Sequence, residues 1–68
     1  MFTGHFTGSE KTALRNRFPK AKKFEAIEYD GSATMTQVRI GKLGFTNVVV
    51  ETDGDGEVTI EDIGAHFS

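Results

Sequence analysis

The chain of 68 residues contains no cysteine, no tryptophan and only one proline. Without cysteine it can have no disulfide framework, no thiolate metal site and no cysteine nucleophile. Its longest uninterrupted aliphatic run is Val48 to Val50, whereas a membrane-spanning helix needs about 20 apolar residues. The N-terminus has neither the basic nor the apolar region of a signal peptide. These absences predict a protein of the reducing cytoplasm that has no membrane partner.

The small size of the chain predicts a single domain over residues 1–68. A domain of this length buries only roughly 60% of the surface that its unfolded chain exposes, so we expect self-association, for example a homodimer, or a partner to add stability. A chain that begins with Met1 is expected to be a complete small reading frame. Regulators, antitoxins, virion accessories and phage proteins are typical of such frames.

The net charge of −2 hides an uneven distribution. Residues 9–23 hold six cationic residues against one acidic residue, a net charge of +5, and residues 24–68 hold nine acidic against two cationic residues, a net charge of −7. Such asymmetry indicates an interaction surface. It is equally expected of a basic helix that packs beside an acidic sheet.

The first 18 residues predict an extended arm followed by one short helix. Gly4 and Gly8 disfavour a helix over residues 1–8, and we expect Phe2 and Phe6 of this arm to pack on the chain's own core. Ser9 is a candidate N-cap for a helix over residues 9–18. Pro19 ends that helix, because the residue before a proline is driven out of the helical region.

The remaining sequence predicts strands joined by short turns. Residues 23–29, 33–40, 45–52 and 57–60 are strand-like, although residues 23–29 also fit a helical turn. The expected fold class is therefore α+β: one short N-terminal helix packed on a four-stranded antiparallel meander sheet over residues 23–63. After Thr59 the chain is expected to turn back and bring Ile63 and Phe67 to the core.

The last hairpin allows a prediction of strand register. A symmetric turn at residues 53–56 pairs Thr52 with Glu57 and Val50 with Thr59. Val49, Val58 and Ile60 then share an apolar face with Phe45, and Val48 and Val50 lie on a mixed face. Because Val48 to Val50 breaks the alternation, a helix or a partner is expected to cover the second face of this strand in part.

Residues 51–62 resemble an EF-hand calcium loop. Oxygen-bearing side chains fall on its ligand positions and Gly56 on its glycine position: Glu51, Asp53, Asp55, Thr59 and Asp62. The flanking segments are strands rather than helices, and Asp-Gly-Asp-Gly is also ordinary turn sequence. We therefore interpret the segment as a plain hairpin, with weak calcium binding as an open alternative and no cofactor expected.

Two charged groups are the candidate binding sites. Carboxylates in and around the hairpin could imitate a row of phosphates and bind a basic protein surface: Glu51, Asp53, Asp55, Glu57 and Glu61. A basic segment is the alternative site, where Phe18 or Phe24 could stack on nucleic-acid bases: Arg15, Arg17, Lys20, Lys22 and Lys23.

Nothing in the sequence predicts an enzyme. His5 and His66 lie near the two termini, with no serine and orienting acid beside them and no metal-ligand spacing between them. We expect a small non-enzymatic protein that binds a protein partner, of the phage or mobile-element kind that inhibits a host nucleic-acid-handling complex. Direct nucleic-acid binding and a structural homo-oligomer, assembled through the Phe2/Phe6 arm and the valine strand, are the alternatives.

Overall fold

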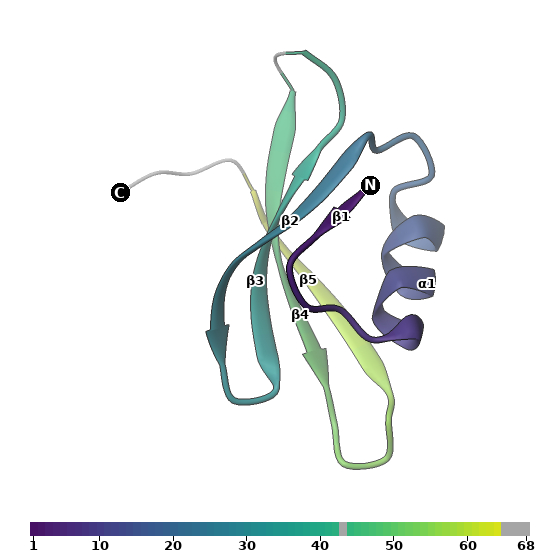
Figure 1. Cartoon of the computed structure of the whole chain (residues 1–68), viewed down its shortest axis with the longest axis vertical. Helices are drawn as coiled ribbons and strands as arrows, with labels where there is room; N and C mark the ends of the chain where they lie inside the picture. Colours follow the sequence, from purple (N-terminus) through teal and green to yellow (C-terminus); the bar gives the residue numbers. More distant parts are fainter. Residues whose placement is uncertain (43, 65–68) are drawn as a thin grey trace.

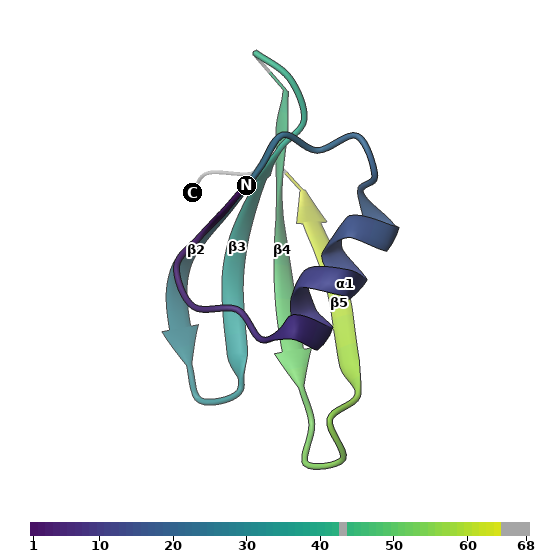
Figure 2. The ribbon, with the colours of Figure 1, turned by 45° about the vertical axis from the view of Figure 1, so that its right-hand side comes forward.

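A computed structural model describes residues 1–42 and 44–64 of the chain. One helix lies on a single five-stranded sheet of order β1-β2-β3-β4-β5 (Figure 1). In chain order the elements are β1 (Phe2–Thr3), α1 (Gly8–Arg17), β2 (Lys23–Asp30), β3 (Ala33–Arg39), β4 (Phe45–Thr52) and β5 (Val58–Gly64). Helix α1 and the N-terminal arm lie on the same face of the sheet (Figure 2).

The α+β class is confirmed, but a sheet of four antiparallel strands is wrong. Strands β2 to β5 form the expected antiparallel meander, and β1 adds a fifth strand that runs parallel to β2. This strand forms because the Phe2 ring stacks on Phe24 at a centroid distance of 4.7 Å. The Phe24 amide also donates a hydrogen bond of 2.8 Å to the carbonyl of Met1.

The arm packs on the chain's own core, as expected. Phe2 and Phe6 are half-buried against the core cluster, and their rings meet edge to face with centroids 5.5 Å apart. Gly4 between them has a φ of 106°, a conformation that residues with a side chain rarely adopt. The arm therefore covers the sheet over β2, beside the area that α1 covers.

Helix α1 begins one residue earlier than predicted, because Thr7 and not Ser9 is its N-cap. The Glu10 amide donates to Thr7 Oγ1, and the Thr7 amide donates to Glu10 Oε1. This reciprocal capping box satisfies two amides at the helix start. Phe18 is the C-cap, so the helix ends before Pro19, as the proline requires.

Residues 23–30 form strand β2, which confirms the strand over the helical alternative. An irregularity between Ala26 and Glu28 shifts the register with β3. Ile27 lies in this bulge, and its side chain is 52% exposed. After the bulge the Tyr29 hydroxyl donates to the carbonyl of His5 and accepts from its amide, which ties the arm to β2.

The predicted register of the last hairpin is wrong by one residue. Thr52 pairs with Val58 and Val50 with Ile60, because Gly56 at a φ of 85° adds a residue to the turn. A one-residue slip moves every side chain of β5 to the other face. Val58 and Ile60 therefore share the helix-covered face with Val50.

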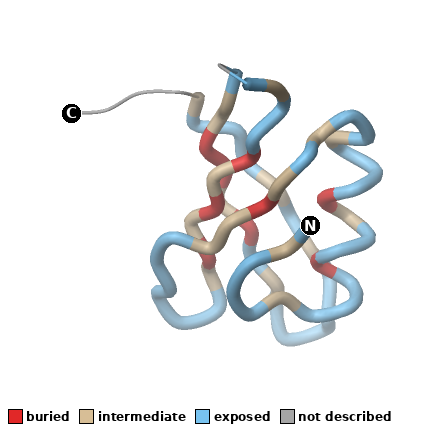
Figure 3. Tube along the Cα trace, turned by 45° about the horizontal axis from the view of Figure 1, so that its top comes forward, coloured by how far each residue is buried: buried red, intermediate tan, exposed pale blue. Residues whose placement is uncertain are grey.

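The core lies between α1 and one face of the sheet. Buried and less buried positions alternate along β3, and in β4 the buried positions are Asn47, Val48 and Val50 (Figure 3). The buried apolar side chains are Leu14, Phe24, Val38, Val48 and Val50. Strand β5 continues to Gly64 and leaves Ile63 39% exposed, so the expected return of Ile63 to the core is wrong. Phe67 and His66 lie outside the described residues.

Candidate functional site

The charged residues separate along the long axis of the molecule, which measures 35 × 27 × 18 Å. The turns at residues 31–32 and 53–57 lie at one end, and residues 18–22 and 40–42 lie toward the other (Figure 1). The sequence analysis left open a basic helix beside an acidic sheet. Instead, most of the exposed acids lie on the hairpins toward one end of the sheet, and six cations lie toward the other end; Lys11 and Arg15 lie on α1, and Glu25 lies beside Lys23.

The acidic end comprises the predicted carboxylates together with two residues of β2. Its members are exposed and lie on the β2–β3 and β4–β5 hairpins: Glu28, Asp30, Glu51, Asp53, Asp55, Glu57 and Glu61. Lys23 and Arg39 stand at the far ends of β2 and β3, and the rest of these hairpins, residues 24–38 and 45–64, contains no lysine or arginine. Within the described part of the chain, the one ion pair joins Lys23 and Glu25 at 3.5 Å, so no member of the acidic end is neutralised by a cation.

Two carboxylates flank an apolar centre on the face that neither α1 nor the arm covers. Glu28 pairs with Met35, Met35 with Val49, and Val49 with Glu61. Paired residues of neighbouring strands point to the same side of a sheet, so these four side chains form one row roughly 14 Å across. Met35 and Val49 are half-buried, and the row presents apolar surface between two acids.

A second pair of acids lies one row nearer the tip. Asp30 pairs with Ala33, Ala33 with Glu51, and Glu51 with Thr59. Glu51 is the diagonal neighbour of Glu61, at a Cα separation of about 7–8 Å. At that distance two exposed carboxylates repel by about 0.5 kcal/mol in water. Repulsion between like charges of this kind opposes folding.

The hairpin tip uses one of its acids for structure and leaves two free for contacts. Asp53 Oδ1 accepts hydrogen bonds of 2.9 Å from the amides of Asp55 and Glu57. The Gly56 amide donates to the carbonyl of Asp53 at 3.0 Å. Residues 52–58 thus form a hairpin turn, as we interpreted them. Among residues 1–42 and 44–64, no group of three or more His, Asp or Glu side chains is placed to hold a metal ion.

The basic end gathers four of the five predicted cations with two others from β3 and the following turn. Its members are Arg17, Lys20, Lys22, Lys23, Arg39 and Lys42. Lys23 pairs with Arg39 across β2 and β3, and the Lys22 amide donates to the carbonyl of Arg39 at 2.8 Å. Arg15 lies apart, on α1, with its guanidinium 5.3 Å from the centroid of the Phe2 ring.

The aromatic residues of this region are largely used inside the fold. Phe24 is 2% exposed, so its predicted role in stacking on bases is wrong. Phe2 stacks on Phe24 and lies under Lys11 and Arg15. Phe18 keeps part of its ring accessible, with the guanidinium of Arg17 at 5.9 Å from its centroid.

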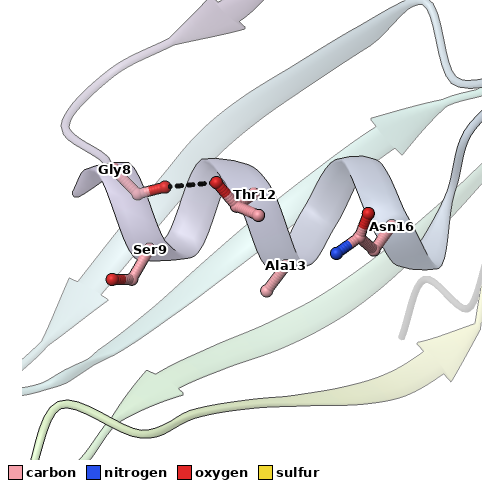
Figure 4. Close-up of a pocket in the computed structure, with 5 residues that line it drawn as sticks. All are labelled: Gly8, Ser9, Thr12, Ala13 and Asn16. Atoms are coloured by element: carbon pink, nitrogen blue, oxygen red, sulfur yellow. Dashed lines mark hydrogen bonds between the residues drawn. The ribbon is translucent and has the colours of Figure 1, made fainter.

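Two hollows lie on the side of the molecule that α1 and the N-terminal arm occupy. One, on the outer surface of α1, is lined by small side chains, and Thr12 Oγ1 donates there to the carbonyl of Gly8 at 3.0 Å (Figure 4). The other lies at the start of α1 between the arm and the sheet. It contains Glu10, whose carboxylate already accepts from the Thr7 amide and the Thr52 hydroxyl. His5 and Ser32 also line this second hollow, where the amide and carbonyl of His5 are hydrogen-bonded to the Tyr29 hydroxyl.

The sequence analysis missed Glu28 and Asp30 as members of the acidic surface. The signal that could have found them is the Asp30-Gly31 turn, which places a second acidic strand end beside the first. It also missed Met35 and Val49 as the apolar centre of the uncovered face.

Comparisons with protein-family models, curated proteins and solved structures find no match for this chain. In the described ranges, 1–42 and 44–64, no helix has the length and apolar character needed to cross a membrane.

Proposed function

We propose that this chain is a small non-enzymatic binding protein whose acidic end docks on a basic, phosphate-binding surface of a nucleic-acid-handling protein. In this proposal it acts in the cytoplasm, as a phage or mobile-element inhibitor that takes the place of nucleic acid. The observation that carries the proposal is that the seven carboxylates of the acidic end lie within residues 24–38 and 45–64 of two adjacent hairpins, and these two ranges contain no lysine or arginine.

The cost of this arrangement supports a binding role. Repulsion of about 0.5 kcal/mol between neighbouring exposed carboxylates could be relieved by a single lysine beside them, yet residues 24–38 and 45–64 contain none. A cationic surface on a partner would relieve it on binding. Complementary charges of this kind accelerate association and select the partner.

The uncovered sheet face supplies the apolar part of the proposed interface. Met35 and Val49 lie between Glu28 and Glu61 on the face opposite α1. An apolar centre surrounded by polar residues is the usual anatomy of a protein interface. We therefore place the contact on this face and on the hairpin tip that continues it.

The homo-oligomer alternative loses the residues on which it rested. Phe2 and Phe6 pack on the core of their own chain, and Val48 and Val50 are fully buried under α1. Val49 alone of the valine strand faces outward, and it lies among acids that would repel a second copy.

The test is capture of phosphate-binding proteins by the immobilised chain. The probe is the heparin-retained fraction of a bacterial cell extract, which concentrates proteins with cationic, phosphate-binding surfaces. We compare the wild type with a neutral variant in which four acids become amides: Glu51→Gln, Asp55→Asn, Glu57→Gln and Glu61→Gln. Asp53 is left in place because its carboxylate holds the turn. The double variant Lys20→Gln/Lys22→Gln is the control for loss of charged side chains at the opposite end of the sheet.

The proposal expects wild type and control to retain proteins that added duplex DNA displaces. The neutral variant should retain at least roughly tenfold less of them, because it lacks the charges that match the partner. Equal retention by the neutral variant, or retention that DNA does not reduce, contradicts the proposal.

A further inference from the structure

A small apolar pocket opens at the basic end, away from the acidic surface. It has a volume of about 210 Å³ and lies between the end of α1 and the segment after β3. Its lining residues are Arg17, Phe18, Pro19, Lys20, Ala21 and Ile40. Four of these are apolar; of the two cations, Arg17 is the last residue of α1 and Lys20 lies in the loop that follows it.

Backbone hydrogen bonds hold the walls of the pocket in place. The Phe18 amide donates to Leu14 at 2.8 Å, and the Ala21 amide donates to Phe18 at 3.1 Å. On the opposite wall, the Ile40 amide donates to the carbonyl of Gly44 at 2.8 Å. Pro19 has a fixed φ. The pocket is therefore formed before any ligand arrives, which lowers the entropy lost on binding.

The size and charge of the pocket indicate what fits it. Its volume is below the roughly 300 Å³ at which small-molecule sites begin, so it suits a single large side chain. Ile40 is 43% exposed, and burial of its surface would favour an apolar occupant. Arg17 and Lys20 line the pocket, and Lys22 and Arg39 lie beside it. Acidic residues on either side of the apolar side chain would match these cations.

The acidic hairpin tip of a second copy of this chain does not supply that occupant. This tip, residues 53–57, contains only aspartate, glycine and glutamate, with no apolar side chain to insert. Nucleic acid fits less well than a peptide, since stacking platforms present several aromatic faces to successive bases. Here Phe24 is buried and Phe2 is stacked upon it, which leaves Phe18 alone.

We propose that this pocket, lined by Phe18, Pro19, Ala21 and Ile40, binds a segment of a partner protein that carries one large apolar side chain between acidic residues. The site is independent of the proposed acidic interface, because the two occupy opposite ends of the sheet (Figure 1). One molecule could thus hold a basic surface at one end and an acidic segment at the other.

The test uses fluorescently labelled peptides of defined sequence at low salt. Two probes, Asp-Glu-Asp-Phe-Glu-Asp-Glu and its leucine counterpart, are compared with the same peptide carrying alanine at the centre. Ile40→Asp places a negative charge in the pocket at an exposed position. Ile63→Asp, at a similarly exposed isoleucine on β5 (39%), is the matched control. Circular dichroism checks that both variants keep the fold.

We expect the phenylalanine or leucine peptide to bind the wild type and Ile63→Asp with equal affinity. Its affinity should fall at least roughly tenfold for Ile40→Asp, as for loss of an interface anchor, and the alanine peptide should bind as weakly. The proposal is overturned if neither probe binds, if the alanine peptide binds equally well, or if Ile40→Asp and Ile63→Asp behave alike. Displacement of a bound probe by a single-stranded oligonucleotide at lower concentration than unlabelled peptide would assign the site to nucleic acid instead and also overturn it.

Discussion

Glu10 joins the start of the helix to the sheet, and replacing it tests how the two layers are held together. Its side chain is 7% exposed. Oε1 accepts a hydrogen bond of 2.9 Å from the Thr7 amide, and Oε2 accepts one of 2.6 Å from the Thr52 hydroxyl. The second bond spans 42 positions in the sequence, so Glu10→Ala removes a local cap and a long-range tie together.

The expected loss follows from these contacts. Hydrogen bonds to a charged group contribute about 1.5–3 kcal/mol each, and both donors lie partly within reach of water, so we take the low end for each. The charge of Glu10 in the first turn adds about 0.5 kcal/mol through the helix dipole. Glu10→Ala should therefore lower the free energy of unfolding by about 2–4 kcal/mol. In a domain of this size that lowers Tm by roughly 15–30 °C.

Urea and thermal unfolding followed by circular dichroism measure this loss, since the chain has no tryptophan. Ser9→Ala is the control, because Ser9 is exposed and adjacent but is not the cap. It should change the free energy of unfolding by less than about 0.5 kcal/mol. Glu10→Gln keeps one acceptor oxygen and should fall between the two. If Glu10→Ala is as stable as Ser9→Ala, the tie between α1 and β4 is wrong.

Three further changes test the arm and the turn. Gly4→Ala should lower the free energy of unfolding by about 1–2 kcal/mol or more, because the added Cβ would lie 2.7 Å from the Cβ of Ala26; Gly54→Ala, where nothing lies within 4 Å, is its control in thermal melts. Phe2→Ala should cost about 2–3 kcal/mol, somewhat less than a fully buried phenylalanine, and an unchanged urea midpoint would show that β1 adds nothing to the sheet. Asp53→Ala should cost about 1 kcal/mol through two lost hydrogen bonds. Asp55→Ala should not lower the midpoint at all.

The helix was predictable from the sequence to within one residue. Pro19 ends the helix whatever tertiary contacts surround it, because a proline disfavours the helical conformation of the residue before it. Two hydroxyl residues, Thr7 and Ser9, were candidates for its N-cap. Thr7 is the cap because Glu10 follows it by three residues. That spacing is the capping-box pattern, so the signal for the correct cap was present in the sequence.

The fifth strand and the hairpin register could not be predicted in the same way. Strand β1 has two residues and forms because the Phe2 ring stacks on Phe24. This contact joins segments that are far apart in the sequence. The register depends on Gly56 taking a positive φ, which a symmetric turn does not require. Because residues 49 and 50 are both apolar, the predicted register and the observed register each give the hairpin an apolar face.

The composition of the acidic surface was partly visible in the sequence. Glu51 and Glu61 were identified from their closeness to the hairpin turn, and the structure places them as diagonal neighbours. Glu28 belongs to the same surface because β3 and β4 bring it into one row with Glu61. That alignment needs the order of the strands, which charge counting along the chain does not contain.

The most direct measurement of the central claim compares stability and capture in one protein, the neutral variant Glu51→Gln, Asp55→Asn, Glu57→Gln and Glu61→Gln. If the carboxylates of the acidic end serve binding and repel one another, the free energy of unfolding of the variant, measured in urea, should be about 0.5–1 kcal/mol higher than that of the wild type, because a carboxylate repulsion has been removed. The same variant should retain at least roughly tenfold less of the DNA-displaceable protein from the heparin-retained fraction. Undiminished retention by a variant of equal or greater stability would contradict the account, because the carboxylates would then have no part in binding.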